Sequence, residues 1–251
     1  GNEKRGRVRY LNVSAQPVTL AGTTIANNTG DTIGGIGLNS PYDGILATAS
    51  ALTDLSGVTI DTNGNLWVAD TYRHSIRFVN RGSNAITLFA GTAAEQTVLP
   101  GQITTINNNV APNAADNVTA NKASFNTPQG LFANAQGIFV IDAIGGPIPT
   151  GNSSPKQRGG LLRFINTSNA TVTFFNGSST PISVAPGFIR TIAGGGTNSD
   201  MGNGGFALNA RFFAPTDLVV NPTTGDIFIT DAGNKAVRKI NGSTGVVSSL
   251  N

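Results

Sequence analysis

Aspartate and arginine at a fixed spacing are the first residues in this sequence that could do chemistry. Asp70 precedes Arg77 by seven positions, and the same interval separates Asp231 from Arg238. Such pairs could form a charged ring for a ligand, or an ion pair between neighbouring strands in which the carboxylate also caps a turn. A feature that recurs in every repeat is usually architectural, so we favour the structural interpretation. The matching positions in the other repeats are Asp142, Arg163 and Arg9.

One loop has the residue types of a calcium site. Residues 61–65 read Asp-Thr-Asn-Gly-Asn and place side-chain oxygens at alternate positions, as the start of a calcium loop does. The closing bidentate glutamate of an EF-hand is missing, and the loop falls where the other repeats have a hairpin turn. We therefore interpret it as a turn. The chain has no cysteine and one histidine, which excludes cysteine-based and multi-histidine metal centres, so we predict no metal site and no cofactor.

Few residues are available for catalysis. His74 lies beside Tyr72 and Arg73 without a second histidine or an obvious nucleophile, which favours a surface histidine over an acid–base catalyst. The glycine-rich stretches 194–196 and 202–205 could cradle a phosphate, but the Lys-Ser/Thr of a P-loop does not follow them. We interpret them as connectors between repeats. The sequence thus predicts no catalytic residue and a protein that is not an enzyme.

The charge balance argues against nucleic acid as a partner. The 251 residues include 16 Lys and Arg against 13 Asp and Glu, a formal net charge of +3. The pI near 9.5 comes from scarce acids, with Glu3 and Glu95 the only glutamates, rather than from a basic patch. No apolar run approaches the roughly 18 residues of a membrane span, and residues 1–10 lack the apolar core of a signal peptide.

Asn-x-Ser/Thr sequons are frequent, and they bear on location. A chain with 12% charged residues, no cysteine and abundant Asn, Thr, Ser and Gly suits a secreted or cell-surface protein. Sequons are glycosylation acceptors when they lie on the surface of such a protein. The candidate glycosylation sites are Asn12, Asn27, Asn117, Asn152, Asn166, Asn169, Asn176 and Asn241.

Internal repeats define the elements that must position these residues. A strand that carries the repeated arginine and ends at an asparagine turn occurs at 9–12, 77–80, 163–166 and 238–241. Three copies follow an apolar strand that ends in aspartate (66–70, 138–142 and 227–231) and, before it, a further short strand (57–60, 130–133 and 217–220). A last strand follows at 18–22, 86–91, 189–194 and 246–250. The pattern predicts units of four antiparallel strands in meander order.

The segments that lead into the units also repeat in matching register. Asp43, Asp116 and Asn203 each lie 15 positions before an aliphatic residue of the first strand. Within these lead-ins, the aligned positions are Ala47, Ala120 and Ala207, then Leu52, Phe125 and Phe212, then Leu55, Pro128 and Pro215. Three agreements at fixed offset make a chance repeat improbable.

These units resemble the NHL repeat, a β-propeller blade motif. The resemblance rests on Gly57-Val58, on Gly64-Asn65-Leu66-Trp67-Val68-Ala69-Asp70-Thr71 and on Ile76-Arg77, and residues 202–210 resemble the linker common in bacterial members. It covers most of the chain and is strongest for residues 57–91 and 203–250. The family implies an all-β propeller, in which four-stranded antiparallel blades form a radial array and closure protects the strand edges.

The repeat boundaries predict three full blades and one half blade. We place the half blade at 1–22 and the full blades at 43–91, 116–194 (with insertions at 145–160 and 176–187) and 203–251. Residues 1–4 align with 233–235, just after the repeated aspartate, so the first unit lacks its first two strands. We expect the chain to be part of a longer propeller of about six blades, or a piece whose open edges another chain completes.

These patterns favour a non-enzymatic, extracellular or cell-surface scaffold. Its long loops and open strand edges would mediate contact with proteins or glycans, or self-assembly. One alternative is a propeller hydrolase or lyase with a divalent metal in its central channel, and another is an RNA-binding NHL module. Fold alone does not choose among them, because propellers host many unrelated functions.

Overall fold

The prediction of an all-β protein is confirmed by the computed structural model. It describes residues 5–11, 16, 18–20, 23–25, 30–34, 43–89, 92, 95–100, 102–107, 116–144, 159–196 and 201–250. Within these ranges short strands alternate with turns, and the only helices are three-residue 3-10 turns. None of these helices is long or apolar enough to cross a membrane.

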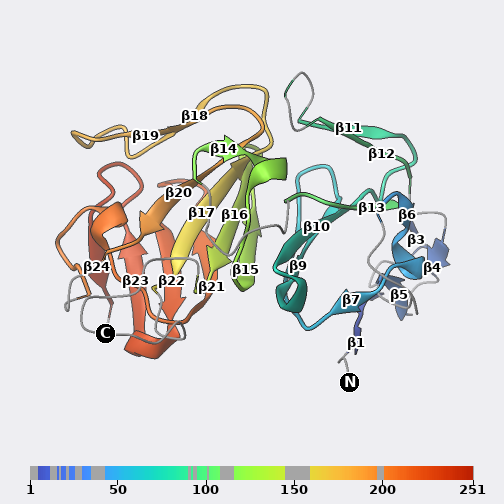
Figure 1. The fold of residues 1–251 in the computed structure, drawn as a ribbon, viewed down its shortest axis with the longest axis horizontal. Helices are drawn as coiled ribbons and strands as arrows, with labels where there is room; N and C mark the ends of the chain where they lie inside the picture. The colour runs from blue at the N-terminus through green and yellow to red at the C-terminus, as the bar shows by residue number, and fades with distance from the viewer. Residues whose placement is uncertain are drawn as a thin grey trace.

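Three antiparallel sheets, which we call the first, second and third blade, follow one another along the chain (Figure 1). The first blade has the order β8 (Leu55–Ile60), β9 (Leu66–Asp70), β10 (Ser75–Val79) and β13 (Gln102–Thr105). The second has β15 (Pro128–Ala133), β16 (Gly137–Asp142), β17 (Leu161–Asn166) and β20 (Phe188–Gly194). The third has β21 (Pro215–Val220), β22 (Ile227–Asp231), β23 (Ala236–Ile240) and β24 (Val247–Ser249). The predicted meander of four strands is present in each.

Each lead-in segment joins the outer edge of its blade. The short strands β6 (Ile45–Leu46) and β14 (Val118–Thr119) pair with β13 and β20, and a single bridge joins Phe206 to Val246 in the third blade. A 3-10 turn follows each of these pairings, at Ala47–Ala49, Ala120–Lys122 and Ala207–Asn209. The lead-in positions that align in the sequence therefore occupy equivalent places in the three blades.

Two hairpins interrupt the blades, and they correct one sequence prediction. Residues 86–91 were expected to form the last strand of the first blade, but β11 (Ile86–Leu88) pairs with β12 (Gln96–Val98), and β13 takes the place beside β10. The second blade has the equivalent hairpin, β18 (Val172–Phe174) with β19 (Ile182–Val184), before its last strand. Both hairpins project from the same end of the molecule (Figure 1).

A repeated asparagine explains why the chain leaves the sheet at these points. The side-chain amide of Asn80 donates to the carbonyl oxygens of Asn84 and Val98, and so ties together the two sides of the hairpin base. Asn166 does the same with the carbonyls of Ala170 and Val184. The hairpin is thus closed at its base, and the chain returns to the blade only after it.

The expected half blade at the N-terminus also differs from the sequence prediction in its strand pairing. Residues 18–22 were expected to pair with the first arginine-bearing strand, but β3 (Val18–Leu20) pairs with β4 (Thr23–Ile25). The strand beside β2 (Val8–Leu11) is instead β5 (Gly30–Gly34). A further short pair, β1 (Arg5–Gly6) with β7 (Leu52–Thr53), connects this region to the first blade.

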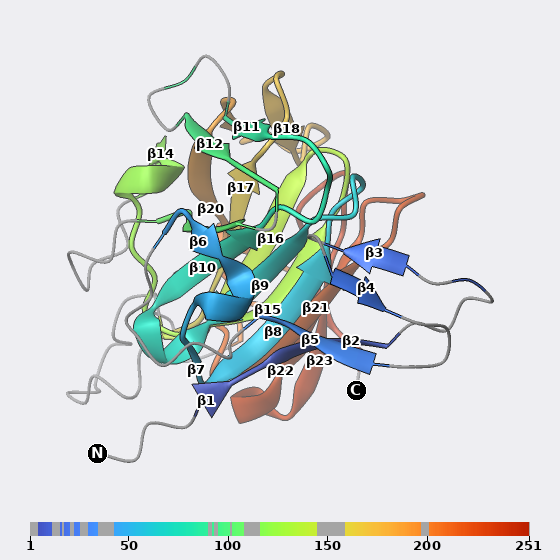
Figure 2. The ribbon, with the colours of Figure 1, turned by 90° about the vertical axis from the view of Figure 1, so that its right-hand side faces the viewer.

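The core lies between the faces of successive blades. Trp67 and Phe78 on the first blade pack with Leu131 on the second, in one buried cluster. Phe139 and further residues of the second blade pack with Leu218 of the third in another. The first strands of the blades, β8, β15 and β21, lie next to one another in this stack (Figure 2).

Glycine permits the closest approach between these first strands. A Cβ at Gly57 would lie 2.1 Å from the carbonyl oxygen of Gln129, and one at Gly130 would lie 2.6 Å from the Cα of Asp217. Since real Cβ atoms do not come so close to backbone, only glycine fits at these two positions. The equivalent position of the third blade is Asp217 itself.

Candidate functional site

The repeated arginines are buried inside the blades. Arg77, Arg163 and Arg238 are each at most 1% exposed. Each lies near the aspartate that ends the preceding strand, because β10 pairs Arg77 with Val68, two residues before Asp70, and the other blades have the same register. Alternate residues of a strand point to the same face, so arginine and aspartate share a face. These buried arginines and aspartates therefore do not form a charged ring at the surface.

The repeated aspartates hold the lead-in segments to the blades. Asp231 Oδ2 lies 3.1 Å from Arg238 Nη1, while its Oδ1 accepts a hydrogen bond from the backbone N–H of Phe213 at 2.7 Å. The corresponding backbone donors are Thr53 for Asp70, at 3.1 Å, and Asn126 for Asp142, at 2.9 Å. The carboxylate thus connects the end of the second strand to the segment that enters the blade.

The arginines contact the same lead-ins from the other side. Arg77 Nη2 lies 3.2 Å from Asp43 Oδ1, and Arg163 Nη2 lies 3.9 Å from Asp116 Oδ1. Arg238 Nη2 donates to Asn203 Oδ1 at 3.0 Å. The sequence aligned Asp43, Asp116 and Asn203 with one another but did not assign them this role; their common register was the available signal. These contacts of the arginines and aspartates with the lead-ins support the structural interpretation of the pairs.

Burial raises the pKa of two of these aspartates. Removal from water raises the pKa of Asp142 from 3.8 to about 6, against the opposing effects of Arg163 and of the backbone N–H of Asn126. Removal from water also raises the pKa of Asp70 to about 6. In both residues Oδ2 has no hydrogen-bond partner in the described part of the chain. Burial lowers the pKa of Arg77 and of Arg163 as well.

The Asp142→Asn variant is expected to gain stability relative to the wild type as the pH rises. The folded protein holds a proton on Asp142 more tightly than the unfolded chain does, so this contribution is complete below about pH 4 and is lost as the pH rises through about 6. Asparagine does not titrate. Between pH 4 and pH 7.5 the difference in free energy of unfolding should shift by about 2–3 kcal/mol in favour of the variant. Urea titrations of both proteins at a series of pH values measure this, and a constant difference would contradict the assignment.

The other candidates lie in structural turns. Asp61 Oδ1 accepts from the backbone N–H groups of Asn63 and Asn65, and its Oδ2 accepts from the indole of Trp67 at 3.1 Å. His74 adopts a left-handed conformation (φ 54°) at the end of a 3-10 turn. Among the described residues there is no group of three or more His, Asp or Glu that could hold a metal ion.

The glycine-rich connectors use their amides internally. The N–H of Gly196 donates to the carbonyl of Ala210, and the N–H of Gly204 donates to that of Val247. These groups therefore face protein acceptors in the folded chain rather than a phosphate.

The sequons differ in their access to solvent. Asn117, Asn169 and Asn176 are exposed and Asn241 is half-buried, whereas Asn12, Asn27 and Asn152 lie outside the described residues. Asn166 must be withdrawn as a candidate in the folded protein. It is fully buried, and its Nδ2 atom, where a glycan would attach, already donates the two hydrogen bonds that close the hairpin.

One repeat position departs from the others. Arg9, on β2, is exposed, although its equivalents in the three blades are buried. Beside it, Val58 and Ile60 on β8 are 54% and 52% exposed. Their equivalents on the second and third blades include Leu131 and Leu218, which are each 7% exposed. At these positions one face of the first blade exposes apolar side chains that the third blade buries, whereas the third blade exposes Val219 (52%) and Val237 (42%) instead.

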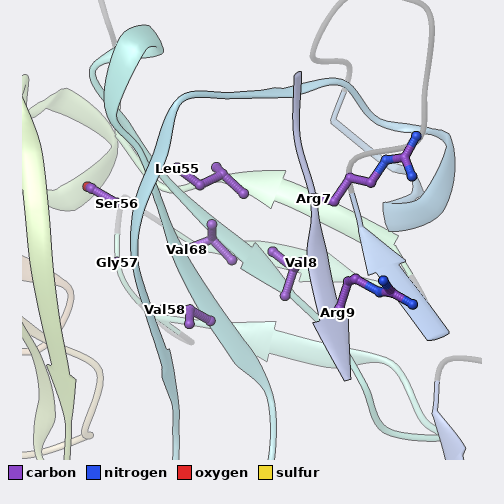
Figure 3. A pocket seen from close by; sticks show the side chains of 8 residues that line it. All are labelled: Arg7, Val8, Arg9, Leu55, Ser56, Gly57, Val58 and Val68. Carbon is purple, nitrogen blue, oxygen red and sulfur yellow. The ribbon is translucent and has the colours of Figure 1, made fainter. Parts of the chain in front are cut away.

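This face surrounds a pocket of about 210 Å³ between β2 and β8 (Figure 3). Val8, Leu55, Val58 and Val68 point toward one another in it, whereas the side chains of Arg7 and Arg9 point away (Figure 3). We call the pocket residues together with Ile60 the open face; its members are Arg7, Val8, Arg9, Leu55, Ser56, Gly57, Val58, Ile60 and Val68. Its exposed apolar surface comes from Val58 and Ile60, while Val8 and Val68 are buried, and it has no catalytic constellation among its residues.

Comparison with known proteins identifies one repeat by sequence. Residues 52–77 match the model of the NHL repeat, and this segment contains β8, β9 and the arginine of β10. No curated protein matches the chain.

Several solved structures match at low similarity. They include a virginiamycin B lyase from Staphylococcus aureus (13% identity, 78% of this chain and 54% of that chain, TM-score 0.29) and an auxiliary nutrient binding protein from Bacteroides thetaiotaomicron (14%, 96% and 55%, 0.35). A putative phosphatase from Bacteroides thetaiotaomicron also matches (14%, 100% and 55%, 0.34). The chain spans about half the length of these three proteins. At such TM-scores the matches say nothing about activity or ligand.

Proposed function

We propose that this protein, which carries an NHL repeat at residues 52–77 within a row of propeller-type blades, is a non-enzymatic scaffold. It works outside the cell or at the cell surface, and it binds protein or glycan partners, or further copies of itself, through its loops and open strand edges. The observation that supports this most directly is the open face, where Val58 and Ile60 are exposed although their equivalents Leu131, Leu218 and Val220 are buried. Exposed apolar surface next to a strand edge is typical of interaction sites.

The projecting hairpins support the same proposal. β11–β12 and β18–β19 extend from one end of the molecule (Figure 1), and their loops carry exposed residues such as Glu95 and Asn176. Loops on a rigid scaffold are where binding residues are most often found.

Site-specific photo-crosslinking tests whether the open face is used. A photoreactive phenylalanine analogue replaces Val58 in the protein expressed in its native cells, and the matched control places it at the exposed Lys122. We expect discrete crosslinked products, either with a partner or with a second copy, from position 58 and not from position 122. No product at position 58, or the same products at both positions, would contradict the proposal for this face.

Glycosylation of the native protein tests the proposed extracellular location. The intact mass of the native protein, before and after glycan removal, should fall on deglycosylation, with attachment at the exposed Asn117, Asn169 or Asn176. An unchanged mass removes the support that the sequons give to an extracellular location.

A further inference from the structure

The hairpin of the second blade is attached to the third blade as well as to its own. Its first strand, β18, ends at Phe174, and the chain then extends over the third blade (Figure 1). There the backbone N–H of Gly177 donates to the carbonyl oxygen of Ser243 at 3.0 Å. Ser243 lies in the turn between β23 and β24 of the third blade. A main-chain hydrogen bond therefore joins the hairpin to the next blade along the chain.

Two adjacent phenylalanines of this hairpin make ring contacts with different blades. The Phe174 ring lies 5.7 Å from that of Phe139 and 4.8 Å from that of Phe164, which are both in the second blade. The Phe175 ring lies 5.7 Å, edge-on, from that of Phe206, which is in the lead-in of the third blade. The hairpin thus contacts its own blade through Phe174 and the next blade through Phe175.

A glycine in the turn before the last strand leaves room for Phe175. A Cβ at Gly245 would lie 2.8 Å from Cγ of Phe175, too close for any side chain. Gly245 has φ 72° and donates its N–H to the carbonyl of Asn241 at 2.9 Å. In the second blade, Gly187 also has φ 72° and donates to the carbonyl of Asn166 at 3.0 Å. These two residues, which we call the turn glycines, are therefore equivalent.

The hairpin of the first blade makes the same kind of contact with the second blade. Its Phe89 corresponds to Phe175, since each follows the first strand of its hairpin and has a positive φ (53° and 55°). Each of their carbonyls accepts a hydrogen bond from the N–H three residues later, that of Thr92 at 3.0 Å and that of Ser178 at 2.9 Å. A Cβ at the turn glycine Gly187 would lie 2.6 Å from Oγ1 of Thr92. Each hairpin therefore lies against the turn glycine of the blade that follows.

The backbone of the two phenylalanines indicates that these contacts matter. A bulky residue with positive φ is strained, and such a conformation persists only where its surroundings fix it. Phe89 and Phe175 are both buried, at 6% and 1% exposure. In arrays of repeats, stability depends on the interfaces between neighbouring units as well as on the units themselves. A strained residue that recurs at such an interface therefore points to a role in joining the units.

We propose that the two hairpins are straps, each of which couples its own blade to the next, so that neighbouring blades open together rather than one at a time. The first blade holds the second in this way, and the second holds the third. The third blade has a tight turn at the equivalent position, so it receives a strap at Gly245. This role does not depend on any partner that the exposed residues of the hairpins bind.

Native-state hydrogen exchange tests the coupling, with Phe175→Ala and Phe174→Ala as a matched pair of variants. The measured quantity is the ratio of the protection of β17 amides, in the second blade, to that of β23 amides, in the third. We expect Phe175→Ala to raise this ratio roughly tenfold or more over the wild type, because the third blade then opens separately. Phe174→Ala should leave it within about threefold of the wild type or lower it. An unchanged ratio in Phe175→Ala, or an equal rise in both variants, would overturn the proposal.

An engineered disulfide separates the contact between blades from the loss of the phenyl ring. The substitutions Gly177→Cys and Ser243→Cys place two thiols across the contact, because a Cβ at Gly177 would lie 2.5 Å from Oγ of Ser243. The chain has no other cysteine. We expect the disulfide to form with oxidised glutathione and, in the Phe175→Ala background, to return the protection ratio to within about threefold of the wild type. The reduced form of the same protein is the control and should keep the raised ratio. Failure of the disulfide to form, or a disulfide without effect on the ratio, would refute the straps.

Discussion

Replacing Asp231 by asparagine is expected to lower the free energy of unfolding by about 3–5 kcal/mol at neutral pH. The carboxylate and the Arg238 guanidinium are both fully buried, 3.1 Å apart, and Asn234 also donates to Asp231 at 2.8 Å. Without the negative charge, the arginine remains buried and uncompensated. Equilibrium unfolding in guanidinium chloride measures the loss, which is a large share of the 5–15 kcal/mol typical of a domain.

Asp226→Asn is the matched control for this substitution. Asp226 contacts Lys239 at 2.9 Å, but the lysine side chain is 32% exposed, so water screens the pair. A pair of this kind contributes about 1 kcal/mol or less. Equal losses for the two variants would show that burial of the Asp231–Arg238 pair does not set its contribution.

Replacing Trp67 by alanine is the second change with a large expected effect, a loss of about 3–5 kcal/mol. The indole is 1% exposed between the first and second blades, its ring lies 5.0 Å from that of Phe78, and its N–H donates to Asp61. Its removal opens a cavity in the cluster that joins the two blades. Because Trp67 is the single tryptophan, unfolding is followed by far-ultraviolet circular dichroism.

Trp67→Phe separates the packing from the hydrogen bond. The phenyl ring keeps the edge-on contact with Phe78 and loses only the donor to Asp61 and part of the buried area, so we expect a loss of about 1–1.5 kcal/mol. A loss in the alanine variant no greater than that in the phenylalanine variant would mean that the first two blades are not held together by this contact.

The strands that end in aspartate were predictable because their pattern is local. Short apolar runs bounded by turns place β9, β16 and β22 within a residue of their observed limits. The last strand of the first blade was not predictable in this way. β11 has the same alternation as a blade strand, and β13 contributes one fully buried aliphatic residue, Ile103. A local sequence pattern predicts that a strand forms, but it does not predict which strand it pairs with.

The candidate site was also predictable only in part. Repeat counting predicts a half blade around Arg9. That Val58 and Ile60 are exposed could not be predicted, because the same residue types are buried at equivalent positions. Likewise, the register of Asp43, Asp116 and Asn203 was visible, while their contact with arginine depends on how the lead-in packs across the blade.

The asparagine that closes each hairpin base makes hairpin length independent of blade architecture. The third blade passes from β23 to β24 through a short turn in which Asn241 accepts from the N–H groups of Ser243 and Thr244. At the same position the first and second blades carry hairpins held by Asn80 and Asn166. One junction thus accommodates either a tight turn or a long excursion while the blade strands keep their pairing. Foreign loops grafted beyond Asn80 or Asn166 would enter at a site where this fold already varies.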